Sequence, residues 1–86
     1  MPQFLAELYM SRTDGREAAG QMERARQAAS ELGRDGIAVE LVRSIYVPDE
    51  ELCFFLYEAQ NEAAVRSALL HAGLPAERIS EAVAPT

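Results

Sequence analysis

The hydrophobic pattern of the chain centres on one continuous apolar and aromatic run, residues 51–59 (ELCFFLYEA). Apolar side chains occupy both odd and even positions in this run, and the run is too short for a typical helix. A strand that is covered on both faces has this pattern. We therefore predict that residues 51–59 form a central strand of a sheet.

Three further segments alternate apolar and polar residues with the period of a strand. They are residues 3–10, residues 37–47 and residues 79–83. Arg43 breaks the alternation of the second segment, which predicts an edge position or a β-bulge near it. Residues 48–50 (PDE) are typical of a turn and join that segment to the central strand as a hairpin.

Two other segments have the period of a helix that buries one side. The first extends from about Asp14 to about Arg34 and carries a narrow, alanine-rich apolar stripe. The second follows Asn61, a residue type that caps helices, and ends at Gly73 and Pro75. Small side chains in the first stripe predict a helix that lies close to a sheet.

The predicted order of elements is strand, helix, strand, strand, helix, strand. With right-handed crossovers, this order predicts an α+β fold of the ferredoxin-like βαββαβ type. The expected architecture is a four-stranded antiparallel sheet in the order 4-1-3-2 with both helices on one face. No linker or internal repeat interrupts the 86 residues, so we expect a single domain, residues 1–86.

Two helices on one face leave the other face of the sheet open. The alternation predicts that this open face carries Leu5, Glu7, Tyr9, Ala38, Glu40, Val42, Ser44, Tyr46, Leu52, Phe54, Leu56, Glu58, Ser80 and Ala82. The opposite parity of the last strand would place Glu81 on this face in place of Ser80 and Ala82. A broad apolar patch on a small protein is typical of an interface or a ligand groove. Because a domain of this size has only a modest core, we expect a homodimer that forms through the open sheet face.

The polar residues predicted on the open face are the candidate ligand-binding site. They are Glu7, Tyr9, Glu40, Tyr46 and Glu58. If the three carboxylates lie close together, they can bind a hard cation or raise one another's pKa enough for general acid or base chemistry. A nearby arginine, Arg43 or Arg12, would neutralise such a cluster.

Composition and charge exclude several classes of function. The net charge is −6, and all eight basic residues are scattered arginines, which argues against a nucleic-acid partner. No apolar run approaches the ~20 residues that span a bilayer, so we expect no membrane partner. The N-terminal residues show no export signal, and the expected location is cytoplasmic.

The sequence predicts no catalytic residues. It contains no glycine-rich phosphate loop, no paired-cysteine motif, no His-Glu-x-x-His and no Gly-x-Ser-x-Gly. The only cysteine, Cys53, lies in the buried run, where a thiol is usually inert. The only histidine, His71, is expected on the exposed side of the second helix.

Several motifs resemble a known family. The corner Gly-Leu-Pro-Ala-Glu-Arg-Ile at residues 73–79 is the most specific, and Asn-Glu-Ala-Ala-Val-Arg at residues 61–66 precedes it. Together with residues 4–7 and 44–47, these motifs resemble the small nickel-binding ferredoxin-like proteins of bacteria, a family otherwise of unknown function. The resemblance implies a ferredoxin-like subunit that dimerises through its sheet. It also makes nickel or another divalent metal the first cofactor to test.

Three functions are compatible with these observations. The first is a homodimeric binding protein that holds a metal or small ligand between its sheets. The second is a cofactor-free dimeric-barrel enzyme, of the monooxygenase or isomerase type, in which a carboxylate or tyrosine moves a proton. The third is a purely structural subunit with a filled interface.

Overall fold

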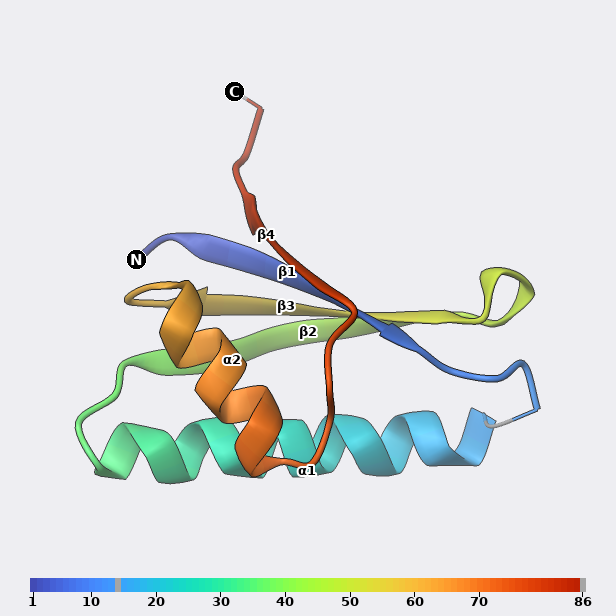
Figure 1. Cartoon of the computed structure of the whole chain (residues 1–86), viewed down its shortest axis with the longest axis horizontal. Coiled ribbons are helices and arrows are strands. Elements are labelled where there is room, and N and C mark those ends of the chain that lie inside the picture. Colours follow the sequence, from blue (N-terminus) through green and yellow to red (C-terminus); the bar gives the residue numbers. More distant parts are fainter. Residues whose placement is uncertain (14, 86) are drawn as a thin grey trace.

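The computed structural model describes residues 1–13 and 15–85. Its elements are the strands β1 (Gln3–Tyr9), β2 (Val39–Val47), β3 (Leu52–Ala59) and β4 (Arg78–Ala82) and the helices α1 (Gly15–Arg34) and α2 (Glu62–His71), with a short 3-10 turn at Pro48–Glu50. Figure 1 shows both helices on the same side of the sheet. The predicted order of strands and helices is therefore confirmed.

The four strands form one antiparallel sheet in the order β2-β3-β1-β4. This is the predicted order 4-1-3-2 read from the opposite edge, so the ferredoxin-like topology is confirmed. The central pair is β1 and β3, and the predicted central strand, residues 51–59, corresponds to β3. The edge strands β2 and β4 each pair on one side only.

The core lies between the sheet and the helices. Its sheet side consists of alternate residues of the central strands, namely Phe4, Ala6 and Leu8 from β1 and Cys53, Phe55, Tyr57 and Ala59 from β3, and each is at most 6% exposed. Helix α1 contributes only alanines as fully buried residues, Ala25, Ala28 and Ala29. Such small side chains let the helix backbone approach the sheet closely, as its alanine-rich stripe predicts.

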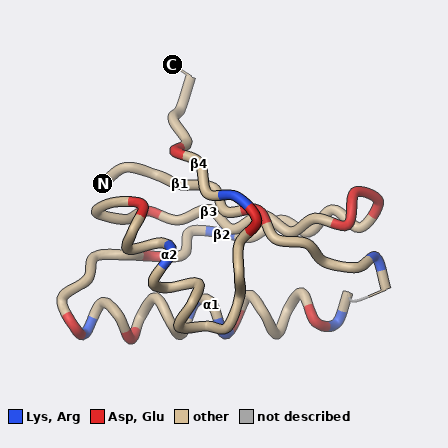
Figure 2. Tube along the Cα trace, in the orientation of Figure 1, with Lys and Arg blue, Asp and Glu red and all other residues tan. Residues whose placement is uncertain are grey.

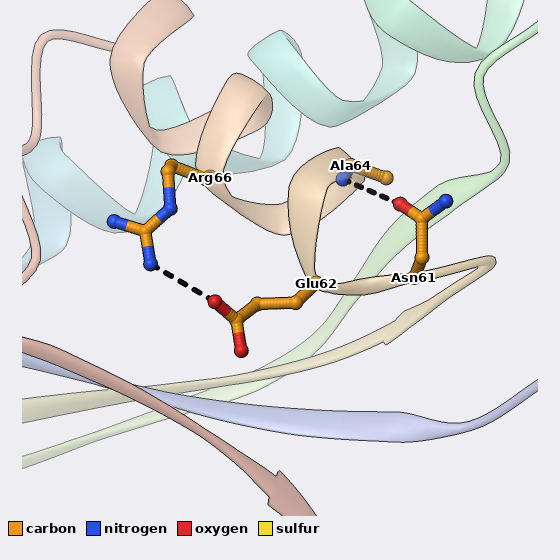
Figure 3. A network of polar contacts seen from close by, with 4 residues as sticks. All are labelled: Asn61, Glu62, Ala64 and Arg66. Carbon is orange, nitrogen blue, oxygen red and sulfur yellow. Dashed lines mark hydrogen bonds and ion pairs between the residues drawn. The ribbon is translucent and has the colours of Figure 1, made fainter.

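Helix α2 supplies the larger side chains of the helix layer, with Val65 and Leu69 buried. Its first turn is fixed by Asn61, whose Oδ1 accepts a hydrogen bond of 2.9 Å from the amide of Ala64 (Figure 3). Glu62 and Arg66, four residues apart on the exposed side, form an ion pair at 3.0 Å (Figure 3). The cap predicted at Asn61 is confirmed.

Both helices end at a glycine that follows them. Gly73 has a φ of 73° and Gly36 a φ of 88°, values that side chains other than glycine rarely adopt. The amide of Leu74 then donates to the carbonyl of Leu69, which closes the last turn of α2. Asp14, the predicted start of the first helix, lies outside the described residues. No described helix has the length and hydrophobicity needed to cross a membrane.

Candidate functional site

The open face of the sheet is the candidate site because neither of the described helices covers it (Figure 1). Cross-strand partners point to the same face, so the pairing register places the open-face residues in four rows across the sheet. The rows are Glu40–Glu58–Gln3–Ala82, Arg43–Leu56–Leu5–Ser80, Ile45–Phe54–Glu7–Arg78 and Val47–Leu52–Tyr9. The prediction that Ser80 and Ala82 belong to this face is confirmed.

The middle of the open face is apolar. Leu5, Leu52, Phe54 and Leu56 lie on the two central strands and are only partly buried, and Ile45 on β2 is 46% exposed. These side chains lie next to one another in the register, so they form one continuous patch. A continuous apolar patch at the centre of a sheet favours a surface that is covered by a partner or a ligand.

A β-bulge in β2 changes which residues of that strand reach the open face. The register shifts between Leu41 and Arg43, which leaves Val42 without a partner. The extra residue reverses the alternation after it, so Arg43 pairs with the open-face residue Leu56. The bulge and the edge position predicted at Arg43 are both confirmed.

The prediction that Tyr46 and Ser44 lie on the open face is wrong for the same reason. Tyr46 pairs with Cys53, and Ser44 with Phe55, and both partners are buried under the helices. The Tyr46 hydroxyl donates a hydrogen bond of 2.6 Å to the carbonyl of Ser11. Tyr46 therefore links β2 to the segment after β1 and is not part of the open-face site.

Of the predicted carboxylates, the structure brings two together. Glu40 and Glu58 lie directly opposite each other on β2 and β3. Glu7 lies four residues along β1 from Gln3, the partner of Glu58, which is ~13 Å along the strand. A cluster of all three carboxylates is thus not formed within one subunit. Among the described residues, no group of three metal-ligating side chains lies close enough together to hold an ion.

Glu7 has an arginine beside it. Its Oε2 lies 3.9 Å from the Nε of Arg78 on the neighbouring strand β4, and the two side chains are 30% and 71% exposed. The sequence suggested Arg43 or Arg12 as the residue that would neutralise a carboxylate cluster, whereas the arginine beside Glu7 is Arg78. The segment before β4 is also held here, because the amide of Glu77 donates to the Glu7 carbonyl at 2.7 Å.

Tyr9 ends the open face next to the β2–β3 turn, and it is 61% exposed. Its hydroxyl donates to Oε2 of Glu51 at 3.4 Å, and the amide of Arg12 donates to the same oxygen at 3.2 Å. Acidic residues concentrate at this turn, as Figure 2 shows. Tyr9 is therefore at the acidic end of the face, in the row that contains Val47 and Leu52.

The only histidine lies away from the open face. His71 is 49% exposed at the end of α2, as predicted, and its Nε2 lies 3.6 Å from Oε1 of Glu31 on α1. The two side chains line a shallow pocket between the helices, of about 170 Å³. A larger pocket of about 280 Å³ lies between α2 and β4 and is lined mainly by leucines, alanine, proline and isoleucine.

Two buried titratable groups are found on the helix side of β3. Burial raises the pKa of the Cys53 thiol, so the thiol stays protonated at neutral pH and is a poor nucleophile. Burial also raises the pKa of Tyr57, whose hydroxyl has no hydrogen-bond partner within the described chain. Neither group reaches the open face.

The donor atoms of the open face determine which cations suit it. Glu7, Glu40, Glu58 and Tyr9 offer oxygen atoms only, and oxygen donors favour hard cations such as Mg²⁺ or Mn²⁺. Nickel is better served by imidazole nitrogen, which in this chain is supplied only by His71. The open-face residues of one subunit therefore do not fit a nickel site.

Comparisons with known proteins agree with this fold. The crystal structure of SCO4226 from Streptomyces coelicolor A3(2) matches with a TM-score of 0.73 and 21% sequence identity, over 98% of this chain and 99% of that one. At this identity the match establishes the fold. A search of curated proteins found no match. The family described as "Nickel responsive protein SCO4226-like" matches residues 9–82, so the chain belongs to this family of nickel-responsive proteins.

Proposed function

We propose that this protein is a homodimeric binding protein that holds its ligand between the open sheet faces of two copies, with a divalent cation as the first candidate. Glu7, Tyr9, Glu40 and Glu58 of both copies would form the polar lining. Membership of a nickel-responsive family supports a metal-related role. The observation that supports the proposal most directly is the open face itself. Its central apolar residues remain partly exposed although they belong to the two central strands.

Burial of the open-face patch supplies a reason to dimerise. Removing apolar surface from water yields ~25 cal/mol per Å², so a patch of several leucine and phenylalanine side chains favours association. A second sheet packed at ~10 Å is the usual cover for such a face. The proposal therefore needs no element beyond a second copy of the chain.

A dimer also changes the chemistry of the site. One subunit brings only Glu40 and Glu58 together, and Glu7 lies elsewhere on the face. A facing copy adds a second set of the same carboxylates and phenols, and a site between copies draws its donors from both. Ligand binding and dimerisation would then be coupled, because the donor set is complete only in the dimer.

Sedimentation velocity tests the dimer. Wild-type protein is expected to sediment as a dimer at micromolar concentration, and Leu56→Glu as a monomer, because it places a charge in the centre of the patch. The matched control is Leu70→Glu, since Leu70 is 68% exposed but lies on α2, away from the open face. A monomeric wild type, or equal effects of both variants, would contradict the proposed interface.

Thermal unfolding in the presence of metals tests the ligand. A cation that binds only the folded dimer stabilises it by mass action, about 2.7 kcal/mol at a concentration 100 times its Kd. The titration should include Mg²⁺, Mn²⁺, Co²⁺, Ni²⁺ and Zn²⁺. The variant Glu58→Gln is expected to lose the stabilisation, whereas Glu23→Gln on the outer side of α1 should keep it.

A further variant distinguishes a metal bound by the open-face carboxylates from a metal bound by His71 and Glu31. Stabilisation by Ni²⁺ that survives Glu58→Gln and is lost in His71→Gln would move the metal from the open face to the contact between His71 and Glu31. Absence of stabilisation by every cation would remove the metal from the proposal and leave the dimer unaffected.

A further inference from the structure

The bulge in β2 places a positive charge next to two negative charges on the same face. Glu40 and Glu58 are directly opposite each other, and like charges in this position destabilise a pair of strands. Arg43 lies in the adjacent row, opposite Leu56, which is two residues along β3 from Glu58 or ~7 Å away. Without the bulge, the alternation would direct Arg43 toward the helices.

Among the described residues, these three charges have no ion-pair partner. In residues 1–13 and 15–85, the ion pairs join Arg66 to Glu62, His71 to Glu31 and Arg78 to Glu7. No hydrogen bond or ion pair joins Glu40, Glu58 or Arg43 to another described side chain. Both charge signs are therefore available on a face that, in the proposed function, meets a second copy.

We propose that Arg43 of each subunit forms an ion pair with the Glu40–Glu58 pair of the other subunit and thereby sets the orientation of the two sheets. This inference rests on the proposed homodimer. A twofold interface is self-complementary, so a contact from Arg43 to the partner's Glu58 implies the reciprocal contact from Glu58 to the partner's Arg43. Two such pairs form for each dimer.

The register permits this arrangement. If the two sheets cross at nearly a right angle, one of the common packings, strands of one sheet lie along the rows of the other. A twofold axis that passes through Leu56 then places Leu56 against its own copy and Arg43 against the partner's Glu58. The same operation places Phe54 against the partner's Leu5. The central apolar residues Leu56, Phe54 and Leu5 therefore meet one another, and the arginine meets the acidic pair.

Electrostatic pairing of this kind specifies orientation more than it adds affinity. The apolar patch by itself would permit several crossing angles. The arginine and the acidic pair distinguish among them, because other twofold axes through Leu56 bring Arg43 over the partner's Leu5, Phe54 or Arg43. The partner's guanidinium would also neutralise part of the charge of the acidic pair, while the carboxylate oxygens that it does not contact stay in the polar lining with Glu7 and Tyr9.

Mixing two single variants tests the inference. Arg43→Glu alone would set a new carboxylate against the partner's Glu58, and Glu58→Arg alone would set a new guanidinium against the partner's Arg43. Each variant is expected to dimerise at least tenfold more weakly than wild type. In an equimolar mixture the heterodimer has two attractive contacts, so its dissociation constant should return to within a few-fold of the wild-type value, as measured by sedimentation and native mass spectrometry.

The matched control makes the same charge changes away from the interface. Arg24→Glu and Glu23→Arg alter exposed residues on α1, and their mixture should show no preference for the heterodimer. Circular dichroism verifies that every variant is folded. A folded Arg43→Glu variant that dimerises like wild type would overturn the inference.

Failure of the inference and failure of the dimer give different results. If wild type dimerises but the Arg43→Glu and Glu58→Arg mixture stays as weakly associated as its components, Arg43 does not face the acidic pair and the homodimer stands. This result is expected if Arg78 faces the partner's Glu58 instead. A monomeric wild type would overturn both proposals.

Discussion

The two faces of strands β1 and β3 differ although they are made by alternate residues of the same segments. On the helix side, residues such as Phe55 and Ala6 are 0% exposed. On the other side, Phe54 and Leu5 are their immediate neighbours and remain partly exposed. Both faces are apolar, so hydrophobicity alone does not distinguish core from interface. The distinction arises from which face the helices cover.

The largest expected difference between the faces is in core stability. Phe55→Ala removes a fully buried ring and should lower the free energy of unfolding by about 3–5 kcal/mol. Phe54→Ala, one residue away, should lower the stability of the isolated subunit by under ~1 kcal/mol, because its ring is only partly buried there, while weakening dimerisation. Urea denaturation of both variants at submicromolar concentration measures their losses in free energy of unfolding. Equal losses would show that the two faces are equivalent.

The helix side of β3 should also make stability depend on pH. Burial raises the pKa of Tyr57 and of Cys53 in the folded state, so the folded state holds these protons more tightly than the unfolded state does. In the unfolded chain the pKa is about 8.5 for a cysteine and about 10 for a tyrosine. The stability that each group contributes is fully present below its unfolded pKa and is lost as pH rises above it, at up to ~1.4 kcal/mol per pH unit for each group.

Tyr57→Phe separates the two titrations. In this variant, the loss of stability that begins near the unfolded pKa of tyrosine should disappear. The loss of stability due to Cys53, which begins at lower pH, should remain. At neutral pH its stability should equal or exceed that of wild type, because the removed hydroxyl is buried without a partner in the described chain. Urea denaturation across pH 7–11 measures both effects, and an unchanged pH profile would show that Tyr57 does not remain protonated by burial.

The stability of the protein should depend on the N-terminal cap of helix α2. Asn61→Ala removes the hydrogen bond from the Ala64 amide and should cost ~1 kcal/mol of stability. Asn61→Asp retains an acceptor in the same place and serves as the control, with a loss of a few tenths of a kcal/mol at most. Thermal or urea unfolding measures the difference, and equal losses would mean that the cap does not stabilise α2.

The smallest effect is expected on the open face. Glu7→Gln removes the contact with Arg78, and an exposed pair at 3.9 Å contributes under ~0.5 kcal/mol. The loss should disappear in 1 M salt, where charges are screened. These values apply to the isolated subunit at submicromolar concentration, where a clear stabilisation by the substitution would instead indicate that Glu7 is repelled by other carboxylates of the same subunit.

Part of the candidate site could be predicted from the sequence. Residues 3–10 alternate without interruption, so Glu7 and Tyr9 lie on the open face as predicted. The β2 segment contains one extra residue, and after Val42 the prediction placed Ser44 and Tyr46 on the wrong face. Arg43 gave the signal, since it interrupted the pattern, but the sequence did not reveal which residue would be bulged.

The order of elements, the central position of β3 and the acidic, apolar composition of the open face could be predicted from the sequence, because they follow from local periodicity and from the length of the apolar run. Which charges are neighbours could not be predicted in this way. The pairing register and the bulge depend on contacts between strands that are distant in the sequence. They place Arg78 beside Glu7, Glu58 opposite Glu40, and Arg43 rather than Tyr46 on the open face.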